Sequence, residues 1–219
     1  MVTIASENLL KAILELDENG ETVIAARLAE FLKISSAAVS MALKRLQRKG
    51  LVRVSSKHSI QLTPQGVRAA TELVRRHRLI ERLLVDVLHM PWERVHEEAE
   101  KLEHAISLEL ETRLLELFGE NGKCPHGNPF TPRLPHRRAP RTYPLTEAPE
   151  NRRLRVARIA ELHEKEKDFL ISLAELELKP GSHLVLLRKT FDGILELKVG
   201  GKKATFASQS GARIWVEAL

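Results

Sequence analysis

The sequence has little of what builds disulfide frameworks, membrane spans or aromatic cores. Its 219 residues include one cysteine, Cys124, so an internal disulfide is excluded. Aromatic residues make up only 4% of the chain, and Leu, Val, Ile and Ala must therefore build the cores. No apolar run approaches the ~20 residues that cross a bilayer, and the first residues lack the pattern of a signal peptide. These absences predict a cytoplasmic protein of a reducing compartment with no membrane partner.

Charge and missing motifs narrow the class of function. The formal net charge of +6 favours a polyanionic partner. The sequence contains neither a Gly-rich phosphate loop nor a Gly-x-Ser-x-Gly elbow, which argues against a nucleotide-dependent or nucleophilic enzyme. At this length the chain has room for one to three small domains.

The first 75 residues are predicted to fold as three helices followed by a β-hairpin. Apolar residues recur at helical spacing over 9–16 and 23–32, and Ser35 and Ser36 are good N-caps for a third helix that Gly50 ends. Residues 51–55 and 59–63 then alternate between apolar and polar, as the two strands of a hairpin do. This order is typical of a winged helix-turn-helix.

The third helix offers two kinds of DNA contact. Basic residues in its last turns and in the hairpin are candidates for phosphate contacts. They are Lys44, Arg45, Arg48 and Lys57. Small and apolar residues at its start are candidates for the major groove. They are Ser35, Ala37, Ala38, Ser40 and Met41. A basic helix end also suits the helix dipole, so the charges alone do not decide for DNA.

His and Glu residues recur at helical contact spacing between residues 77 and 104. His77 and Glu81 are four residues apart, and His96, Glu100, Glu103 and His104 fall on one predicted helix face beside an apolar stripe. Mixed imidazole and carboxylate ligands suit divalent ions such as Mn²⁺, Fe²⁺, Co²⁺ and Zn²⁺. The alternative is a solvated or structural face in a winged-helix protein that binds no metal.

The remaining segments complete a prediction of three domains. The fold class is mainly α with small β parts: a winged helix-turn-helix over 1–75, a helical metal-binding and dimerisation domain over 76–150, and an SH3-like β-barrel over 151–219. Residues 119–150 are rich in Gly, Pro and Arg and are predicted to be a linker. Leucines of the helical middle are more numerous than one small core requires, which favours a dimer over a purely intramolecular core.

Two helical segments carry a family resemblance. RRHRLIERLLVDVL (75–88) and VHEEAEKLEHAIS (95–107), together with the winged helix, resemble the diphtheria toxin repressor family of metal-dependent transcriptional regulators. The resemblance covers nearly the whole chain, including a C-terminal SH3-like domain of the FeoA type. It implies a repressor that binds a palindromic operator as a homodimer when a divalent metal is bound, and so controls metal-ion homeostasis.

The resemblance also implies a regulatory metal site. Matched residue by residue, its ligands are Asn8, His77, Glu100, Glu103 and His104. Glutamate at position 100 is typical of the manganese-sensing branch, where iron-sensing members carry cysteine. The three-domain manganese-responsive members are therefore the ones this chain resembles most. Mn(II) is the expected cofactor, with Fe(II) as the alternative and Co(II) or Zn(II) as substitutes in vitro.

Two further positions bear on that regulatory site. Manganese-sensing members usually carry aspartate where this chain has Asn8, which leaves the site with one negative charge fewer. Lys11 stands where the short two-domain members carry a glutamate that helps to hold a pair of ions. A paired-metal arrangement is therefore not expected at the regulatory site.

A second metal site is implied by the longer manganese-dependent members. Its residues in this chain are Glu81, Cys124, His126 and Glu161. His96 matches an accessory position of the iron-sensing branch, and three roles are open to it: a ligand, a residue that supports a ligand, or a solvated helix residue.

The rival of a different class is a carboxylate/His di-metal enzyme. Such enzymes need a Glu-x-x-His from each of two helices, and this chain has one such spacing, Glu93 to His96. The prediction is therefore a Mn(II)-dependent repressor and not an enzyme, with an Fe(II)-dependent repressor of the same family as the alternative.

Overall fold

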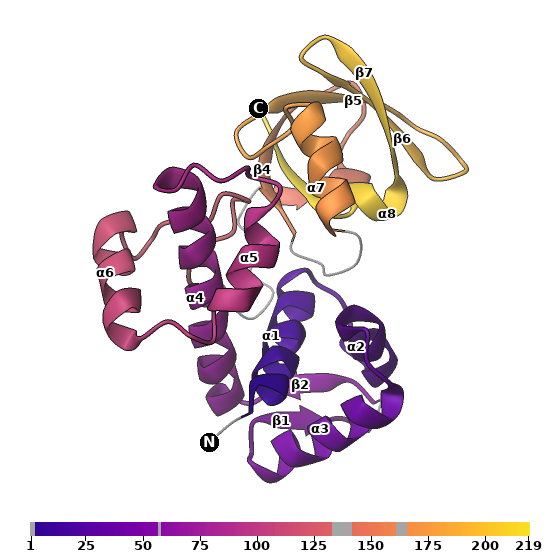
Figure 1. Cartoon of the computed structure of the whole chain (residues 1–219). Coiled ribbons are helices and arrows are strands. Elements are labelled where there is room, and N and C mark those ends of the chain that lie inside the picture. Colours follow the sequence, from indigo (N-terminus) through magenta and orange to yellow (C-terminus); the bar gives the residue numbers. More distant parts are fainter. Residues whose placement is uncertain (1–2, 57, 133–141, 161–165) are drawn as a thin grey trace.

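The computed structural model describes residues 3–56, 58–132, 142–160 and 166–219. Figure 1 shows three parts: an N-terminal bundle of helices with a small hairpin, a helical middle built around one long helix, and a curled C-terminal sheet. The N-terminal and C-terminal parts lie at opposite ends of the molecule, and the helical middle runs along one side of both.

The N-terminal part is the predicted winged helix. Its elements are α1 (Ile4–Glu18), α2 (Ala25–Leu32), α3 (Ser36–Arg48), β1 (Val52–Val54) and β2 (Ile60–Leu62). The hydroxyl groups of Thr3 and Ser35 accept hydrogen bonds from backbone N–H groups in the first turns of α1 and α3, which satisfies donors that a helix start leaves unpaired. The apolar faces of all three helices meet in one core with the hairpin.

The helical middle contains α4 (Pro64–Asp86), α5 (Val95–Leu102) and α6 (Leu108–Phe118). The expected face from His96 to His104 is not one continuous helix, because α5 ends at Leu102 and Glu103 is its C-cap. The backbone then turns, with Ala105 N–H donating to the carbonyl of Leu102, and Ser107 caps the next helix. Glu103 and His104 therefore project from a turn beside α4.

Part of the predicted linker is folded against this helical middle. Lys123 and Pro129 form an antiparallel bridge, and Cys124 N–H donates to the carbonyl of Asn128 at 2.8 Å. Cys124 and Phe130 are buried in a small core with Leu79 and Leu114, residues of α4 and α6. Residues 124–128 thus form a short loop that is fixed on the helices.

The C-terminal part is one antiparallel sheet with the strand order β3-β8-β4-β5-β6-β7. Its strands are β3 (Thr142–Pro144), β4 (Arg153–Ile159), β5 (His183–Lys189), β6 (Ile194–Val199), β7 (Lys202–Ala207) and β8 (Ile214–Ala218). The short helix η1 (Leu145–Glu147) follows β3, while α7 (Glu166–Glu175) and α8 (Ser208–Gly211) complete this part. The β-strands predicted for residues 151–219 are present, and the sheet also includes β3, which lies inside the segment expected to be a linker. β3 is only three residues long and shows no alternating pattern. Its pairing with β8 holds it in the sheet.

Several large apolar residues of the helical middle are exposed in the single chain. They are Val87, Leu88, Leu102, Leu108, Leu110 and Leu117. Within the described part of the chain, no helix is long and apolar enough to cross a membrane.

Candidate metal centre

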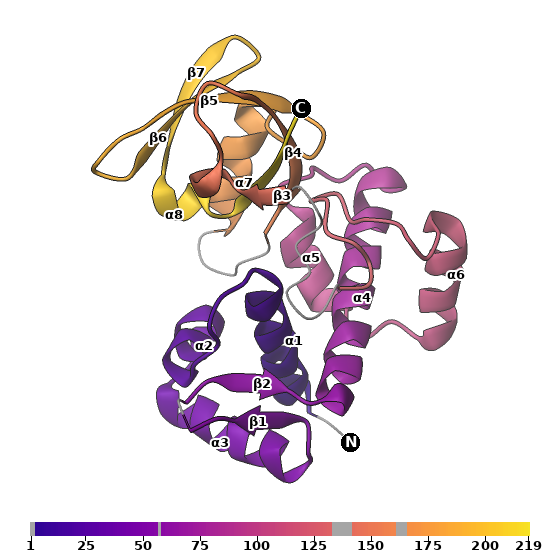
Figure 2. The same ribbon diagram turned by 180° about the vertical axis from the view of Figure 1, so that it is seen from behind.

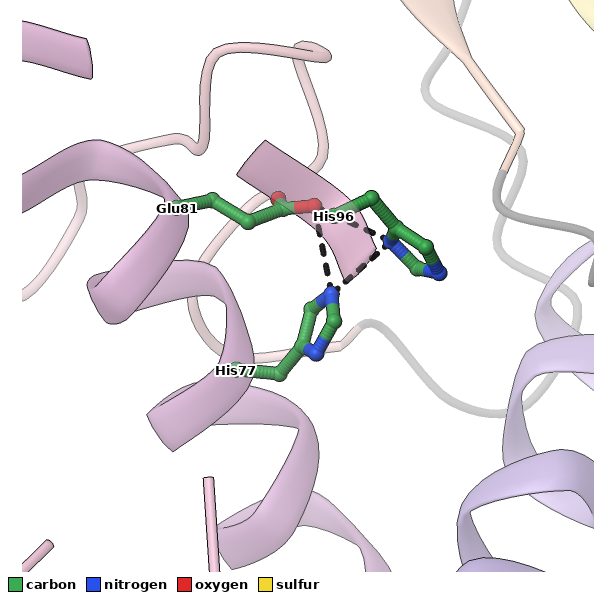
Figure 3. A group of neighbouring side chains, drawn as sticks. All are labelled: His77, Glu81 and His96. Atoms are coloured by element: carbon green, nitrogen blue, oxygen red, sulfur yellow. Dashed lines mark hydrogen bonds and ion pairs between the residues drawn. The ribbon is translucent and has the colours of Figure 1, made fainter. Parts of the chain in front are cut away.

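Three imidazole rings converge on one carboxylate oxygen in the helical middle. Oε1 of Glu81 lies 3.1 Å from Nε2 of His77, 3.1 Å from Nδ1 of His96 and 3.2 Å from Nδ1 of His126. His77 and Glu81 project from successive turns of α4, and His96 approaches from α5 (Figure 3). All four side chains are buried.

The loop at residues 124–128 completes this cluster. Cys124 and His126 offer a sulfur and a ring nitrogen that lie with a Glu81 oxygen within 4.8 Å of one another. The Trp92 ring packs on the His126 ring at 4.8 Å between centroids, and its Nε1–H donates to the carbonyl of Pro125 at 3.0 Å. The indole therefore fixes both the loop and the imidazole.

The arrangement fits a divalent ion. Ligand atoms that surround one ion at about 2.1 Å stand ~3 Å apart, which is the spacing of these nitrogen and oxygen atoms. Nε2 of His77 also lies 2.9 Å from Nδ1 of His96, although a neutral ring offers only one N–H donor. The second oxygen of Glu81, Oε2, is buried and has no hydrogen-bond partner among the described residues. A cation would satisfy all of these atoms at once, whereas hydrogen bonds alone leave Oε2 unpaired.

A cationic side chain already lies beside the next carboxylate. Nζ of Lys11, from α1, is 2.7 Å from Oε2 of Glu103 and 3.0 Å from Nδ1 of His77, and the lysine is almost fully buried. Nδ1 of His77 is in turn 2.5 Å from the same Glu103 oxygen. His77 therefore joins Glu103 on one side of its ring to Glu81 and His96 on the other.

His104 forms the other end of this network. Its Nε2 lies 2.7 Å from Oδ1 of Asn8 and 3.6 Å from Oε1 of Glu103, and its Nδ1 lies 2.9 Å from Oε2 of Glu7. The residues from α1 belong to the winged helix, whereas Glu103 and His104 follow α5. Oxygen and nitrogen donors from two parts of the molecule thus meet here. The side-chain amide of Asn8 fits an ion as an uncharged oxygen ligand.

The structure brings Glu81, Cys124 and His126 of the expected second site together, and it places His77 between Glu81 and Glu103. Within the described ranges, groups of three His, Cys, Asp or Glu ligands at this spacing are His77–Glu81–His96 and Glu81–Cys124–His126. His77 thus lies with residues of the expected second site and contacts Glu103, while Asn8 and His104 lie farther along the network. Glu100 is a third exposed and lies 3.6 Å from Nε2 of His96. Glu161 lies outside the described residues.

Glu7 and Trp92 contact the network but were not identified from the sequence. Glu7 has a usable signal, since it directly precedes Asn8 in the first turn of α1. Trp92 has none, because its contact with the 124–128 loop depends on the tertiary fold.

The buried charges shift one another's protonation. Burial and the neighbouring Lys11 charge disfavour a charged His77, but Glu81 and Glu103 outweigh them and raise its pKa to about 9. Burial opposes the charged form of Glu103, yet Lys11 and His77 lower its pKa to about 2. The pKa of Glu81 is likewise lowered despite burial, by His126 and His77. At neutral pH, ionised carboxylates thus face positively charged partners.

The predicted DNA contacts lie on the outer face of α3. Ala37, Ser40, Met41 and the basic residues of the last turns are exposed, while Val39, Leu43 and Leu46 point into the core. Ser35 is used as the N-cap, because its hydroxyl accepts from Ala38 N–H at 3.2 Å. Lys57 lies outside the described residues.

Comparison with known families covers all three parts of the chain. The family model for the N-terminal DNA-binding domain of iron-dependent repressors matches residues 1–60, and the model for their metal-binding and dimerisation domain matches residues 63–132. The FeoA domain matches residues 143–218.

Individual relatives match over nearly the full length. The diphtheria toxin repressor of Corynebacterium diphtheriae is 34% identical over 222 residues, which are 98% of this chain and 97% of that protein. A solved structure of a manganese-dependent transcriptional repressor in complex with manganese has a TM-score of 0.84 and 31% identity, covering 98% and 100% of the two chains. The manganese regulator SloR has a TM-score of 0.82 and 29% identity, covering 98% of each chain.

A winged helix joined to a buried His/Glu/Cys cluster defines a class of protein, the metal-dependent transcriptional repressors, which are DNA-binding proteins and not enzymes. Within this class, the chain belongs to the diphtheria toxin repressor family. The predicted resemblance and fold class are thus confirmed.

The pKa of His77 predicts a pH dependence of the metal-free protein. Because the pKa is raised from 6.5 to about 9 on folding, the protonated ring stabilises the fold fully below pH 6.5, and this contribution is lost as the pH rises through 9. Urea unfolding in EDTA, between about pH 6 and pH 10, should show a steeper fall in unfolding free energy for the wild type than for His77→Gln. His89→Gln, at an exposed histidine, is the control and should keep the wild-type slope. Equal slopes for the wild type and His77→Gln would contradict a raised pKa of His77 in the folded protein.

Proposed function

We propose that this repressor binds a palindromic operator in the cytoplasm as a homodimer, and that Mn(II) is the activating metal. The observation that carries the proposal is the contact between His104, which follows α5, and Glu7 and Asn8 of α1. An ion held by Asn8, Glu103 and His104, with Glu100 and His77 nearby, would supply the positive charge that fixes α1 against the helical middle. Since the core of the winged helix joins α1 to α3, this also fixes the recognition helix.

The donor atoms are the reason for choosing manganese. Amide and carboxylate oxygens with one or two imidazoles suit Mn(II), and the absence of a thiol from this group of residues weakens selection for softer ions. Fe(II) is the alternative, because similar ligands bind both and cellular availability decides. The cluster around Glu81 contains Cys124 and three imidazoles, a softer set that would also accept Co(II) or Zn(II) in vitro.

We also propose a dimer interface and three domain boundaries. A second copy of the chain would cover the exposed apolar residues that follow α4 and those of α5 and α6, and one of the matching family models describes a dimerisation domain. We keep the domain boundaries at 1–75, 76–150 and 151–219, with β3 as a strand that the middle segment contributes to the C-terminal sheet.

The DNA interface is proposed on the exposed face of α3. Its first turns, with Ser35, Ala37, Ala38, Ser40 and Met41, would lie in the major groove. Lys44, Arg45, Arg48 and the hairpin residue Lys57 would contact phosphates.

The function is tested by operator binding with and without metal. A palindromic duplex that the protein selects from a random pool should bind at least ~10-fold more tightly in saturating Mn²⁺ than in EDTA, which corresponds to roughly 1.4 kcal/mol of coupling. Glu103→Gln removes an anionic ligand but keeps the shape, so it should lose most of this response while remaining folded. Glu98→Gln, on the exposed side of α5, is the matched control. Equal affinity of the wild type in EDTA and in Mn²⁺ would exclude the proposed function.

The proposed second site consists of Glu81, Cys124, His126 and the predicted ligand Glu161. It should bind an ion of its own, separate from the one at the regulatory site. Cys124→Ser preserves the size of the side chain but replaces the thiolate ligand, so it should remove about one metal per chain and weaken operator binding without abolishing it. Metal content measured after dialysis against Mn²⁺ or Co²⁺, combined with operator affinity, checks this. If Cys124→Ser retains all its metal, Cys124 is not a ligand.

Lys11 limits the regulatory site to one ion in this proposal. Burial opposes its charged form, but Glu15 and Glu103 outweigh burial and raise its pKa above the usual 10.5, so the ammonium stays charged. A buried cation 2.7 Å from a Glu103 oxygen neutralises one of the carboxylate ligands and repels a further ion. The metal-free site is thereby held together by the protein's own charge.

Replacing Lys11 by Met should separate these two effects. Without metal, Lys11→Met leaves Glu103 buried beside fewer positive charges, and we expect a loss of stability of about 3–5 kcal/mol. With Mn²⁺ present, the variant should bind the ion more tightly than the wild type and regain stability. Thermal unfolding in EDTA and in Mn²⁺, together with calorimetric titration, measures both. Lys101→Met, at an exposed ion pair of α5, should leave both the stability and the Mn²⁺ affinity at their wild-type values. A Lys11→Met protein with unchanged Mn²⁺ affinity would refute this role.

A further inference from the structure

Arg158 of β4 contacts three segments that are far apart in the sequence. Its Nη1 donates to Oδ1 of Asn19 at 3.0 Å and to Oδ1 of Asn128 at 3.2 Å. The guanidinium carbon lies 4.2 Å from the centre of the Trp215 ring on the neighbouring strand β8. One side chain of the C-terminal sheet thus contacts the end of α1 and the 124–128 loop.

On one side, Arg158 is tied to the loop of the proposed second metal site. Asn128 is fully buried. Its side-chain Nδ2 donates to the backbone carbonyl of Ile159 at 2.8 Å, and its backbone carbonyl accepts from the N–H of Cys124. Ile159 N–H donates to the carbonyl of His126 at 2.8 Å. At Gly127 (φ 85°), a Cβ would lie 2.5 Å from the carbonyl oxygen of Ala157, so only glycine allows this approach to β4. A displacement of Cys124 and His126 would therefore also displace the groups that Arg158 contacts.

On the other side, Arg158 reaches the DNA-binding part. Asn19 is the C-cap of α1, the helix that carries Glu7 and Asn8 near its other end and Lys11 at its middle. Figure 1 shows the C-terminal end of α1 directed towards the C-terminal sheet, while α3 lies at the far end of the molecule. The preceding residue, Glu18, is held at 2.6 Å by Arg78 of α4, which also donates to the carbonyl of Pro129. The end of α1 thus rests on two guanidinium groups that also contact the segment 128–129.

We propose that Arg158 is a positioning residue that transmits occupancy of the second metal site to the DNA-binding part. The inference rests on the proposed function, because it assumes that Cys124 and His126 hold an ion. A bound ion would fix the 124–128 loop and with it Asn128. One guanidinium nitrogen serves both Asn128 and Asn19, so fixing the first acceptor orients the donor towards the second. α1 would then be oriented at its C-terminal end by the second site and at its N-terminal end by the regulatory site.

The test is a double-mutant cycle between Arg158→Gln and Cys124→Ser. It measures whether the effects of the two substitutions on operator affinity depend on each other, which a purely structural role of Arg158 would not produce. The measured quantities are metal content per chain and affinity for the selected palindrome in saturating Mn²⁺. Arg158→Gln should keep the wild-type metal content but bind the operator about 5-fold more weakly, at the low end of allosteric coupling. Cys124→Ser should lose one metal and show a similar weakening. The double variant should be no weaker than either single variant.

Two further variants control this cycle. Arg155→Gln removes an exposed guanidinium from the same strand, paired with Glu217, and should bind the operator like the wild type. Asn19→Ala removes the other acceptor without touching the sheet, so it should reproduce the effect of Arg158→Gln and decides the question if Arg158→Gln does not fold.

The outcomes separate the two levels of the proposal. Full metal content in Cys124→Ser would mean that the second site itself is wrong. Loss of metal in Cys124→Ser, with wild-type operator affinity in Arg158→Gln or in Asn19→Ala, would overturn the role of Arg158 alone. Weakening factors that multiply in the double variant would do the same, because they would show that the two residues act independently.

Discussion

Burying the carboxylates of Glu81 and Glu103 within the helical middle costs free energy unless positive charge or hydrogen-bond donors lie within reach. The rest of the site follows from this constraint. His77, His96 and His126 surround Glu81, and Lys11 reaches Glu103 from the DNA-binding part. Because His77 contacts both carboxylates, the two proposed metal sites belong to one electrostatic network. A change of charge at one carboxylate therefore acts on the other.

Helix α1 connects this network to the DNA-binding part of the chain. Its first turns contact His104 and its last residues contact guanidinium groups of α4 and β4. The same helix contributes Leu9, Ile13 and Leu16 to the core on which α3 packs. A helix held at both ends and packed on the recognition helix moves as a unit, so small displacements at the buried charges reach the DNA-binding face.

Periodicity in the sequence predicted elements that have a local pattern, but it did not predict features that depend on distant segments. The order of helices and strands in the winged helix and the place of the C-terminal β part in the chain were predicted, because both carry strong local patterns. The end of α5 at Leu102 was not, because helical spacing continues through residues that the backbone places in a turn. β3 was missed for a related reason, since its pairing partner lies more than 70 residues away. The candidate metal ligands were proposed from the resemblance, whereas the grouping of His77 with Glu81 and His96 was not predicted.

The sequence by itself determined the class of fold, the basic outer face of α3 and the supply of His, Glu and Cys side chains, because these depend on residue type and on spacing along one helix. Only the tertiary structure decided which of these side chains lie together, that Lys11 contacts His77 and Glu103, and how Trp92 and Arg158 hold the 124–128 loop. These are contacts between segments that are 30 to more than 130 residues apart in the chain. Such contacts leave no periodic signal, since the packing of whole elements sets them.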